Sequence, residues 1–173
     1  FPMRSLDKAT SDEEINHFVN ETALGATRFL SQPKLDGSAL SLEYRKGRLV
    51  RAATRGSGER GEDVTRNARK VGNVPERLNV EVDVHVRGEV VMRCDIFESK
   101  YSEVSPNPRN LAAGALRQKR AEGKAKASDL VFQAYDAKFP VAADRHPDSI
   151  DAPKTEYDSE ILDWLSEVAG ICP

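Results

Sequence analysis

The chain has 173 residues, of which 39% are hydrophobic and 31% are charged, and its mean hydropathy is -0.57. These values are typical of one soluble globular domain. No apolar run approaches the ~18 residues that a membrane-spanning helix needs, and no secretory signal is visible. Two cysteines are too few for a disulfide scaffold or a four-cysteine zinc site. We therefore expect a cytoplasmic monomer that makes no contact with membranes.

The net charge of -2 hides an uneven distribution along the chain. Residues 28–70 carry eleven basic and five acidic side chains, and residues 107–126 carry six and one. Residues 141–173 reverse the balance, with two basic and eight acidic side chains. The two basic stretches are compatible with a local phosphate-binding surface, although a solvated surface with chance clustering explains charge alone equally well.

The first part of the chain predicts a helix followed by a β-hairpin. Residues 11–22 begin with Ser11 and Glu14 at capping-box spacing. An apolar stripe at helical spacing follows, made of Ile15, Phe18 and Val19. Residues 38–54 alternate apolar and polar side chains around a turn, which is typical of two antiparallel strands.

The rest of the chain mixes strands and helices without a regular β–α–β alternation, which predicts an α+β fold. The expected elements are a mobile glycine-rich loop at 55–61, a short polar helix at 62–70, a strand at 80–92, a helix at 107–119, a strand at 130–135, an acidic loop at 137–156 and a helix at 159–169.

The segment KLDG at 34–37 is the first candidate for chemistry. Lys34 lies between two predicted strands, where burial would favour the neutral, nucleophilic form of its amine. Asp36 could orient that amine, and Gly37 would let a ligand approach the backbone. Taken alone, a short lysine motif in a turn is more often just a turn.

Two further segments add weight to this reading. Glu89 lies in the apolar strand VRGEVVM, and a buried glutamate needs a partner or a ligand. A structural ion pair with Arg87 is the alternative. Arg55 ends a predicted strand at the glycine-rich loop, which suits anion binding, although an ordinary exposed loop would look similar.

Together with several longer segments, these motifs make the chain resemble the adenylation (nucleotidyltransferase) domain of bacterial-type NAD-dependent DNA ligases. The long segments starting at TRG and NPRN are specific, whereas KLDG or RGE alone would be weak. The matching segments occur in the family's order: PMRSL at 2–6, KLDG at 34–37, ATRGSGERGEDVTRN at 53–67, VRGEVVM at 86–92, NPRNLAAGALRQ at 107–118 and LVFQAYD at 130–136.

The resemblance implies a nucleotidyltransferase (ATP-grasp-like) fold with antiparallel sheets and flanking helices. Residues 1–27 would form a helical lead-in, 28–136 the nucleotide-binding core, and 137–173 an acidic loop and a helix. It also implies that Lys34 attacks the α-phosphate of NAD and forms a lysine-adenylate, with Asp36 positioning the amine.

The remaining roles follow from the same resemblance. The nucleotide would be bound by Ser5, Leu6, Gln32, Arg55 and Glu89. Arg109 and Arg117 would face phosphates of the cofactor or of nicked double-stranded DNA, and Mg²⁺ would assist. The AMP would pass to the 5′-phosphate and the 3′-hydroxyl would seal the nick, as DNA replication and repair require.

Gln32 stands where the family usually has glutamate, which predicts weaker recognition of the adenine amino group. The chain begins with Phe1 and lacks a later lysine motif of the family, so we expect a fragment or a degenerate protein with little ligation by itself. A non-catalytic DNA-binding remnant is the main alternative. An ATP-using ligase or capping-type guanylyltransferase also contains KxDG, but the TRG and NPRN segments argue against it.

Overall fold

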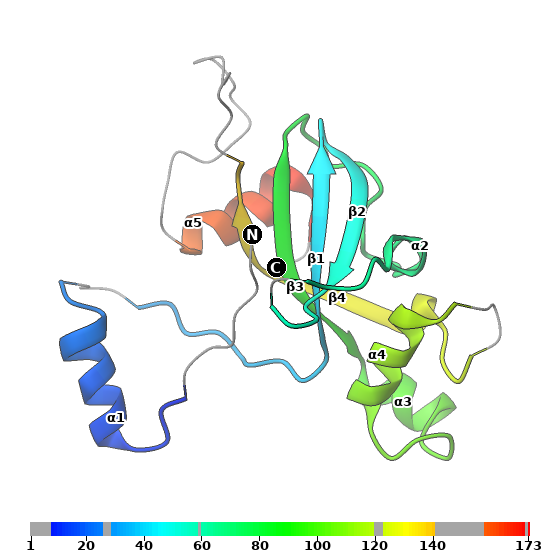
Figure 1. Ribbon diagram of the computed structural model, residues 1–173, viewed down its shortest axis with the longest axis horizontal. Coiled ribbons are helices and arrows are strands. Elements are labelled where there is room, and N and C mark those ends of the chain that lie inside the picture. Colours follow the sequence, from blue (N-terminus) through cyan, green and yellow to red (C-terminus); the bar gives the residue numbers. More distant parts are fainter. Residues whose placement is uncertain (1–7, 26–28, 59, 120–122, 141–157, 172) are drawn as a thin grey trace.

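The structure is a computed structural model, and it describes residues 8–25, 29–58, 60–119, 123–140, 158–171 and 173. A four-stranded antiparallel sheet with the order β2-β1-β3-β4 forms its centre (Figure 1). The strands are β1 (Ser38–Arg45), β2 (Arg48–Thr54), β3 (Val84–Met92) and β4 (Leu130–Lys138). Helices and an antiparallel sheet therefore confirm the predicted α+β class.

The described residues also form α-helices and shorter helical turns. The α-helices are α1 (Asp12–His17), α2 (Thr65–Ala68), α3 (Cys94–Lys100), α4 (Pro108–Arg117) and α5 (Asp158–Asp163). The π-helical turns η1 (Phe18–Thr22) and η3 (Trp164–Ala169) continue α1 and α5, and the 3-10 turn η2 (Ala127–Asp129) precedes β4. Within the described residues, no helix has both the length and the apolar composition needed to cross a bilayer.

The predicted hairpin is confirmed, and its turn is tight. Lys46 and Gly47 have φ angles of 47° and 70°, as the two central residues of a type I′ turn require. Asp83 holds this turn, because its carboxylate accepts a hydrogen bond from the backbone N–H of Lys46 at 2.7 Å. The turn sets the register of β1 against β2, and β1 pairs with β3 along its other edge.

One face of the sheet builds the hydrophobic core. Alternate residues of a strand point to opposite faces, so a strand with period-two burial has one core face. The side chains of Tyr44 and Phe132 are fully buried at its centre. Trp164 and Leu165 of η3 pack into the same core, as do the apolar side of α4 and the segment around α2. The predicted amphipathic helix at 159–169 is thus confirmed as a cover for the core.

Three local predictions need correction. The strand predicted at 80–92 begins only at Val84, and the strand predicted at 130–135 continues to Lys138, inside the loop predicted at 137–156. The helix predicted at 62–70 is confined to Thr65–Ala68, because Asp63 instead pairs with Ala53 in an isolated β-bridge beside β2. Helix α1 begins at the predicted cap, where the Ser11 hydroxyl accepts from the Glu14 N–H at 3.3 Å.

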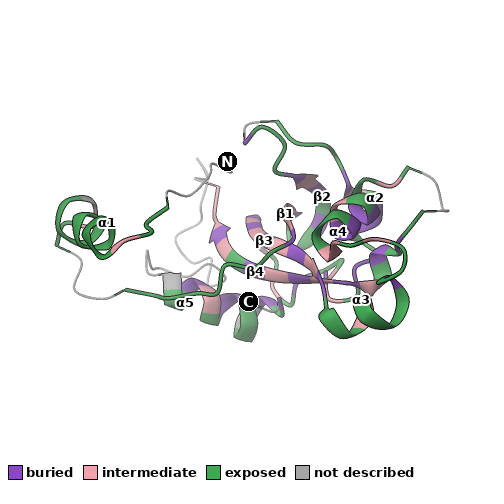
Figure 2. Ribbon diagram, turned by 90° about the horizontal axis from the view of Figure 1, so that it is seen from below, coloured by how far each residue is buried: buried purple, intermediate pink, exposed green. Residues whose placement is uncertain are grey.

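The apolar stripe on this helix is nevertheless exposed, since Ile15 and Phe18 retain about half of their accessible surface. Figures 1 and 2 show α1 standing away from the sheet, so the sheet does not cover the stripe. The Phe18 ring instead lies near that of Phe29, with 6.4 Å between the ring centroids.

Candidate functional site

The sheet face opposite the core carries half-buried polar side chains. The antiparallel register places Glu89 of β3 between Ala39 of β1 and Gln133 of β4. Two residue pairs further along, Arg87 lies opposite Ser41. Because these residues alternate with the buried ones, their side chains all lie on this second face, which we call the open face.

Gly37 brings the KLDG segment against the open face. Its backbone lies so close to β3 that a Cβ atom would overlap the carbonyl oxygen of Val90. Its N–H faces the Glu89 carboxylate and lowers the pKa of that group. Only glycine permits this approach, since any side chain would push the two backbones apart. The close contact therefore sets Lys34 and Asp36 at the edge of the open face.

Glu89 lies where several charges meet. Burial raises its pKa above the ordinary value, while the nearby cations Lys34 and Arg109 and the Gly37 N–H act in the opposite direction. Asp36 also acts on this carboxyl and raises its pKa. The lysine of the KLDG segment and the glutamate of β3 are thus within electrostatic reach of each other.

Lys34 itself is exposed, so the predicted burial of its amine is wrong. Strands were predicted on both sides of this residue. In the described part of the chain the first strand begins at Ser38, and residues 29–37 are without regular structure. An isolated extended segment shields little of a long side chain, so the amine acts electrostatically on Glu89 without being enclosed.

Asp36 pairs with helix α4. Its carboxylate lies 3.2 Å from the Arg109 guanidinium, and both side chains are exposed. Asn107 caps this helix, because its side-chain oxygen accepts from the N–H of Arg109 at 2.8 Å and from that of Asn110 at 3.3 Å. The cap fixes the first turn of α4 and so holds Arg109 next to the KLDG segment.

Arg55 follows β2 and begins the glycine-rich loop. A cavity of about 500 Å³ lies between this loop and the open face, and Arg55 is among its lining residues, together with Glu43 and His85. Gly61 closes the loop against β2, where a Cβ atom would overlap the Thr54 carbonyl oxygen. The structure therefore brings Arg55 to the open face but keeps its side chain exposed.

Tyr135 is a residue of this face that the sequence analysis missed. It is 37% exposed, and its hydroxyl lies within electrostatic reach of both Glu89 and Arg55. Burial, and secondarily the charge of Glu89, raise its pKa. The sequence did contain a signal for this residue. Side chains alternate between the two faces of a strand, which places Tyr135 on the face opposite the buried Phe132 and Ala134.

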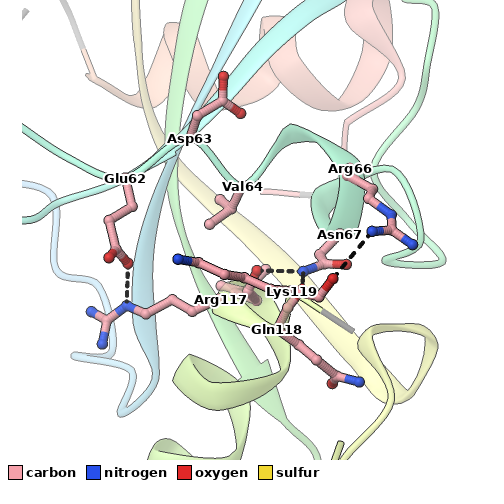
Figure 3. Close-up of a pocket in the computed structure, with 9 residues that line it drawn as sticks. Glu62, Asp63, Val64, Arg66, Asn67, Arg117, Gln118 and Lys119 are labelled. Atoms are coloured by element: carbon pink, nitrogen blue, oxygen red, sulfur yellow. Dashed lines mark hydrogen bonds and ion pairs between the residues drawn. The ribbon is translucent and has the colours of Figure 1, made fainter. Parts of the chain in front are cut away.

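Arg117 lies at the other end of α4, away from the KLDG segment. Its Nε atom is 3.1 Å from the Glu62 carboxylate, which precedes α2 (Figure 3). Asn67 of α2 joins the two elements, because its side-chain amide donates to the carbonyls of Leu116 and Gln118, both at 2.7 Å. Arg117 is therefore held at a second hollow and not at the Lys34 cluster.

Among the described residues, the structure shows no contact between the other predicted site residues and the charged groups around Glu89. Ser5 and Leu6 lie outside the described residues. Gln32 is exposed in the segment that leads to Lys34. Arg87 does not form the alternative ion pair with Glu89. It pairs instead with Asp136 of β4 at 3.3 Å, and both side chains are largely buried.

A dedicated metal cage is absent from the described residues, since no three His, Cys, Asp or Glu side chains converge there. Mg²⁺ commonly binds through one or two carboxylates together with substrate phosphates. Asp36 and Glu89, which act on each other electrostatically, are the acidic groups of the Lys34 cluster. This donor set fits an ion held mainly by the phosphates of a bound nucleotide.

Replacing Glu89 with glutamine is expected to stabilise the chain at neutral pH. Burial raises the pKa of this carboxyl, so the folded chain binds its proton more tightly than the unfolded chain does. Its ionisation therefore costs stability as pH rises above the ordinary value of 4.5. Urea unfolding should show Glu89→Gln more stable at neutral pH and equal to the parent chain below pH 4.5. A constant difference at all pH values would contradict this.

Comparison with known proteins identifies the class of this site. Residues 1–166 match the family model of the NAD-dependent DNA ligase adenylation domain. A DNA ligase of Stenotrophomonas maltophilia is 48% identical over 132 residues, which is 68% of this chain and 16% of that protein. A DNA ligase of Nitrobacter winogradskyi is 40% identical over 187 aligned positions, which cover 98% of this chain and 25% of that protein.

The chain therefore belongs to the NAD-dependent DNA ligase adenylation-domain family, which confirms the resemblance carried by KLDG, TRG and NPRN. It spans a quarter or less of the length of these relatives.

Proposed function

We propose that this chain is the nucleotide-binding part of an NAD-dependent DNA ligase and that Lys34 is its nucleophile. One observation carries the proposal: Lys34 acts electrostatically on Glu89. The KLDG segment that contains Lys34 lies against β3 at Gly37, where there is no room for a side chain. Family membership supports NAD as the adenylate donor. Residues 28–136 would form the nucleotide-binding core, with 1–27 leading into it and 137–173 following it.

The open face offers a nucleotide three kinds of contact. The Glu89 carboxylate can accept hydrogen bonds from ribose hydroxyls. The exposed ring of Tyr135 can stack on a base, since every base has a π-face. Arg55 can bind ribose or phosphate oxygens from the rim of the adjoining cavity. Gln32 would accept a hydrogen bond from the adenine amino group through its amide oxygen.

The chemistry assigned to Lys34 is a phosphoryl-type substitution. Its neutral amine would form a P–N bond to the α-phosphorus of NAD while the bond to nicotinamide mononucleotide breaks. The lysine loses one proton to solvent, and the leaving phosphate takes the bonding electron pair. Positive charge near the phosphate oxygens stabilises such a transition state. Arg109, held near Lys34 by Asp36, can supply it.

The next steps would use DNA. The AMP would pass from Lys34 to the 5′-phosphate of a nick, and the 3′-hydroxyl would displace it. Arg109 and Arg117 are the proposed phosphate contacts, because a guanidinium group can donate two parallel hydrogen bonds to one phosphate. Mg²⁺ would supply further charge neutralisation when it is bound by the substrate phosphates.

The proposal is tested by incubating the chain with Mg²⁺ and NAD that carries a radiolabel in its adenylate phosphate. We expect a covalent label on the chain that is stable to denaturation, and we expect Lys34→Ala to abolish it. Lys34→Arg should abolish it as well, because a guanidinium group keeps the charge but is not a nucleophile at neutral pH.

The control for folding is Lys70→Ala, which removes another exposed lysine, and it should keep the label. Equal labelling of the Lys34→Ala chain would refute the assignment of the nucleophile. An unlabelled parent chain that still binds DNA would instead support a non-catalytic remnant of the same fold.

A further inference from the structure

Strand β4 contains a β-bulge on the open face. Two consecutive residues of β3 pair with Ala134 and Asp136 of β4, so Tyr135 is the extra residue of the bulge. The burial along β4 agrees with this register. Ala134 and Ala137 are buried three positions apart, whereas buried side chains of a regular strand lie two apart. The bulge therefore puts two consecutive side chains, those of Tyr135 and Asp136, on the open face.

Gly88 of β3 marks the place where the bulge begins. The register shifts between this glycine and Arg87. A Cβ atom on Gly88 would overlap the carbonyl oxygen of Gln133 and the ring of Phe132. The two strands can therefore approach this closely only at a glycine. Bulges often lie next to active sites, where they change the direction of a side chain.

A largely buried ion pair holds the other side of the bulge. Nη1 of Arg87 lies 3.3 Å from Oδ2 of Asp136, and the two side chains are only 16% and 18% exposed. Lys138 adds a second cation 3.2 Å from the same carboxylate. A buried ion pair contributes little net stability, but removing one partner is costly because the other charge stays buried and unpaired. The pair therefore favours the register that sets Asp136 against β3, directly after the bulge.

Tyr135 is the side chain that this arrangement presents. It is 37% exposed, so its ring can meet a ligand. The charges of Glu89, Arg87 and Asp136 all act on its hydroxyl. The tyrosine is therefore close both to the ion pair and to the carboxylate that we assign to the ribose. Because the base and the ribose of a nucleotide are joined, the ring must keep one direction relative to Glu89 if both are to be bound.

We propose that Arg87 and Asp136 are positioning residues, whose ion pair holds the bulge in the form that directs the Tyr135 ring at the base of the bound nucleotide. This inference rests on the proposed function, in which the base stacks on Tyr135. The two charges act through the register of β4 and do not need to touch the nucleotide. Without the pair the bulge can slip by one residue, and such a slip turns a side chain to the other face of the sheet.

The test measures binding of AMP to the chain by equilibrium dialysis and by proton NMR. When a base stacks on an aromatic side chain, the ring current shifts the resonances of the adenine ring protons upfield. Tyr135→Ala should abolish this shift and weaken binding at least about fivefold, the lower end of what one stacked base contributes. Asp136→Ala leaves the tyrosine in place, yet it should reduce the shift and weaken binding about three- to tenfold.

The two substitutions should not be additive, because they remove the same contact. In the Tyr135→Ala background, Asp136→Ala should weaken AMP binding by less than about twofold. A merely structural role of Asp136 would weaken binding equally in both backgrounds and leave the shift of bound AMP unchanged. Either result would overturn the inference.

Asp129→Ala is the matched control for loss of a paired carboxylate. Asp129 is 14% exposed and lies 2.9 Å from Lys100, but it belongs to η2 and precedes β4. This variant should keep the affinity for AMP and the upfield shift. A second variant, Arg87→Gln with Asp136→Ala, leaves no unpaired buried cation and so is less prone to unfold. It should lose the shift as Asp136→Ala does, and a parent-like shift in this variant would contradict the inference.

The outcome is separable from that of the proposed function. Reversible binding of AMP does not require the nucleophile, so Lys34→Ala should keep the upfield shift and its dependence on Asp136. An unlabelled parent chain that shows these AMP effects would refute only the nucleophile. A chain that is labelled at Lys34 but gives AMP no upfield shift would refute only the positioning role. A chain that takes no label and binds no AMP would refute both.

Discussion

Replacing Gly37 with alanine is expected to reduce covalent labelling by NAD at least about 100-fold, since an error of about 1 Å in the position of a reacting group can cost that much. The new Cβ atom would overlap the Val90 carbonyl oxygen, which is part of the sheet and cannot rotate away. The KLDG segment must then move off β3, which takes the Gly37 N–H away from the Glu89 carboxylate. Autoradiography of the denatured chain measures the effect.

The same substitution should also lower the free energy of unfolding by about 1–3 kcal/mol, the usual range for overpacking. Gly72→Ala is the matched control, because a Cβ atom at that position meets nothing within 4 Å. It should keep full labelling and unchanged or slightly higher stability. Full labelling of Gly37→Ala would show that the close approach to β3 is not needed for the chemistry.

The hairpin and the helix at 107–119 could be predicted from the sequence because their signals are local. A lysine–glycine turn between alternating strands and an asparagine cap followed by proline each depend on a few neighbouring residues. Residues 62–70 failed as a helix for the opposite reason. Asp63 finds a partner in Ala53, and no helical pattern within the segment reveals a β-bridge to another strand.

The sequence predicted part of the candidate site. Features that depend on neighbouring residues could be predicted, whereas features that depend on packing between distant segments could not. The clustering of Lys34 with Glu89 follows from family motifs. The exposure of Lys34 does not, because burial depends on what packs over residues 29–37 rather than on the motif itself. The separation of Arg109 from Arg117 does follow from helix geometry, since eight residues of an α-helix rise about 12 Å. The pairing of Arg117 with Glu62 required the fold.

Asn67→Asp is expected to lower the free energy of unfolding at neutral pH by about 3 kcal/mol or more, because it buries a charge without a partner. The amide of Asn67 donates to two carbonyl oxygens, whereas a carboxylate has no donor and would face both oxygens with a negative charge. Urea unfolding at neutral pH measures the loss.

The pH dependence of this loss identifies its cause. Burial beside two carbonyls raises the pKa of the introduced carboxyl, so the folded chain retains the proton more strongly than the unfolded chain. The destabilisation should therefore be smaller below the unfolded pKa of about 3.9 and should grow as pH rises. Asn110→Asp makes the same change at an exposed site in the first turn of α4, where a negative charge is favourable. Equal losses for both variants would mean that Asn67 does not join α2 to α4.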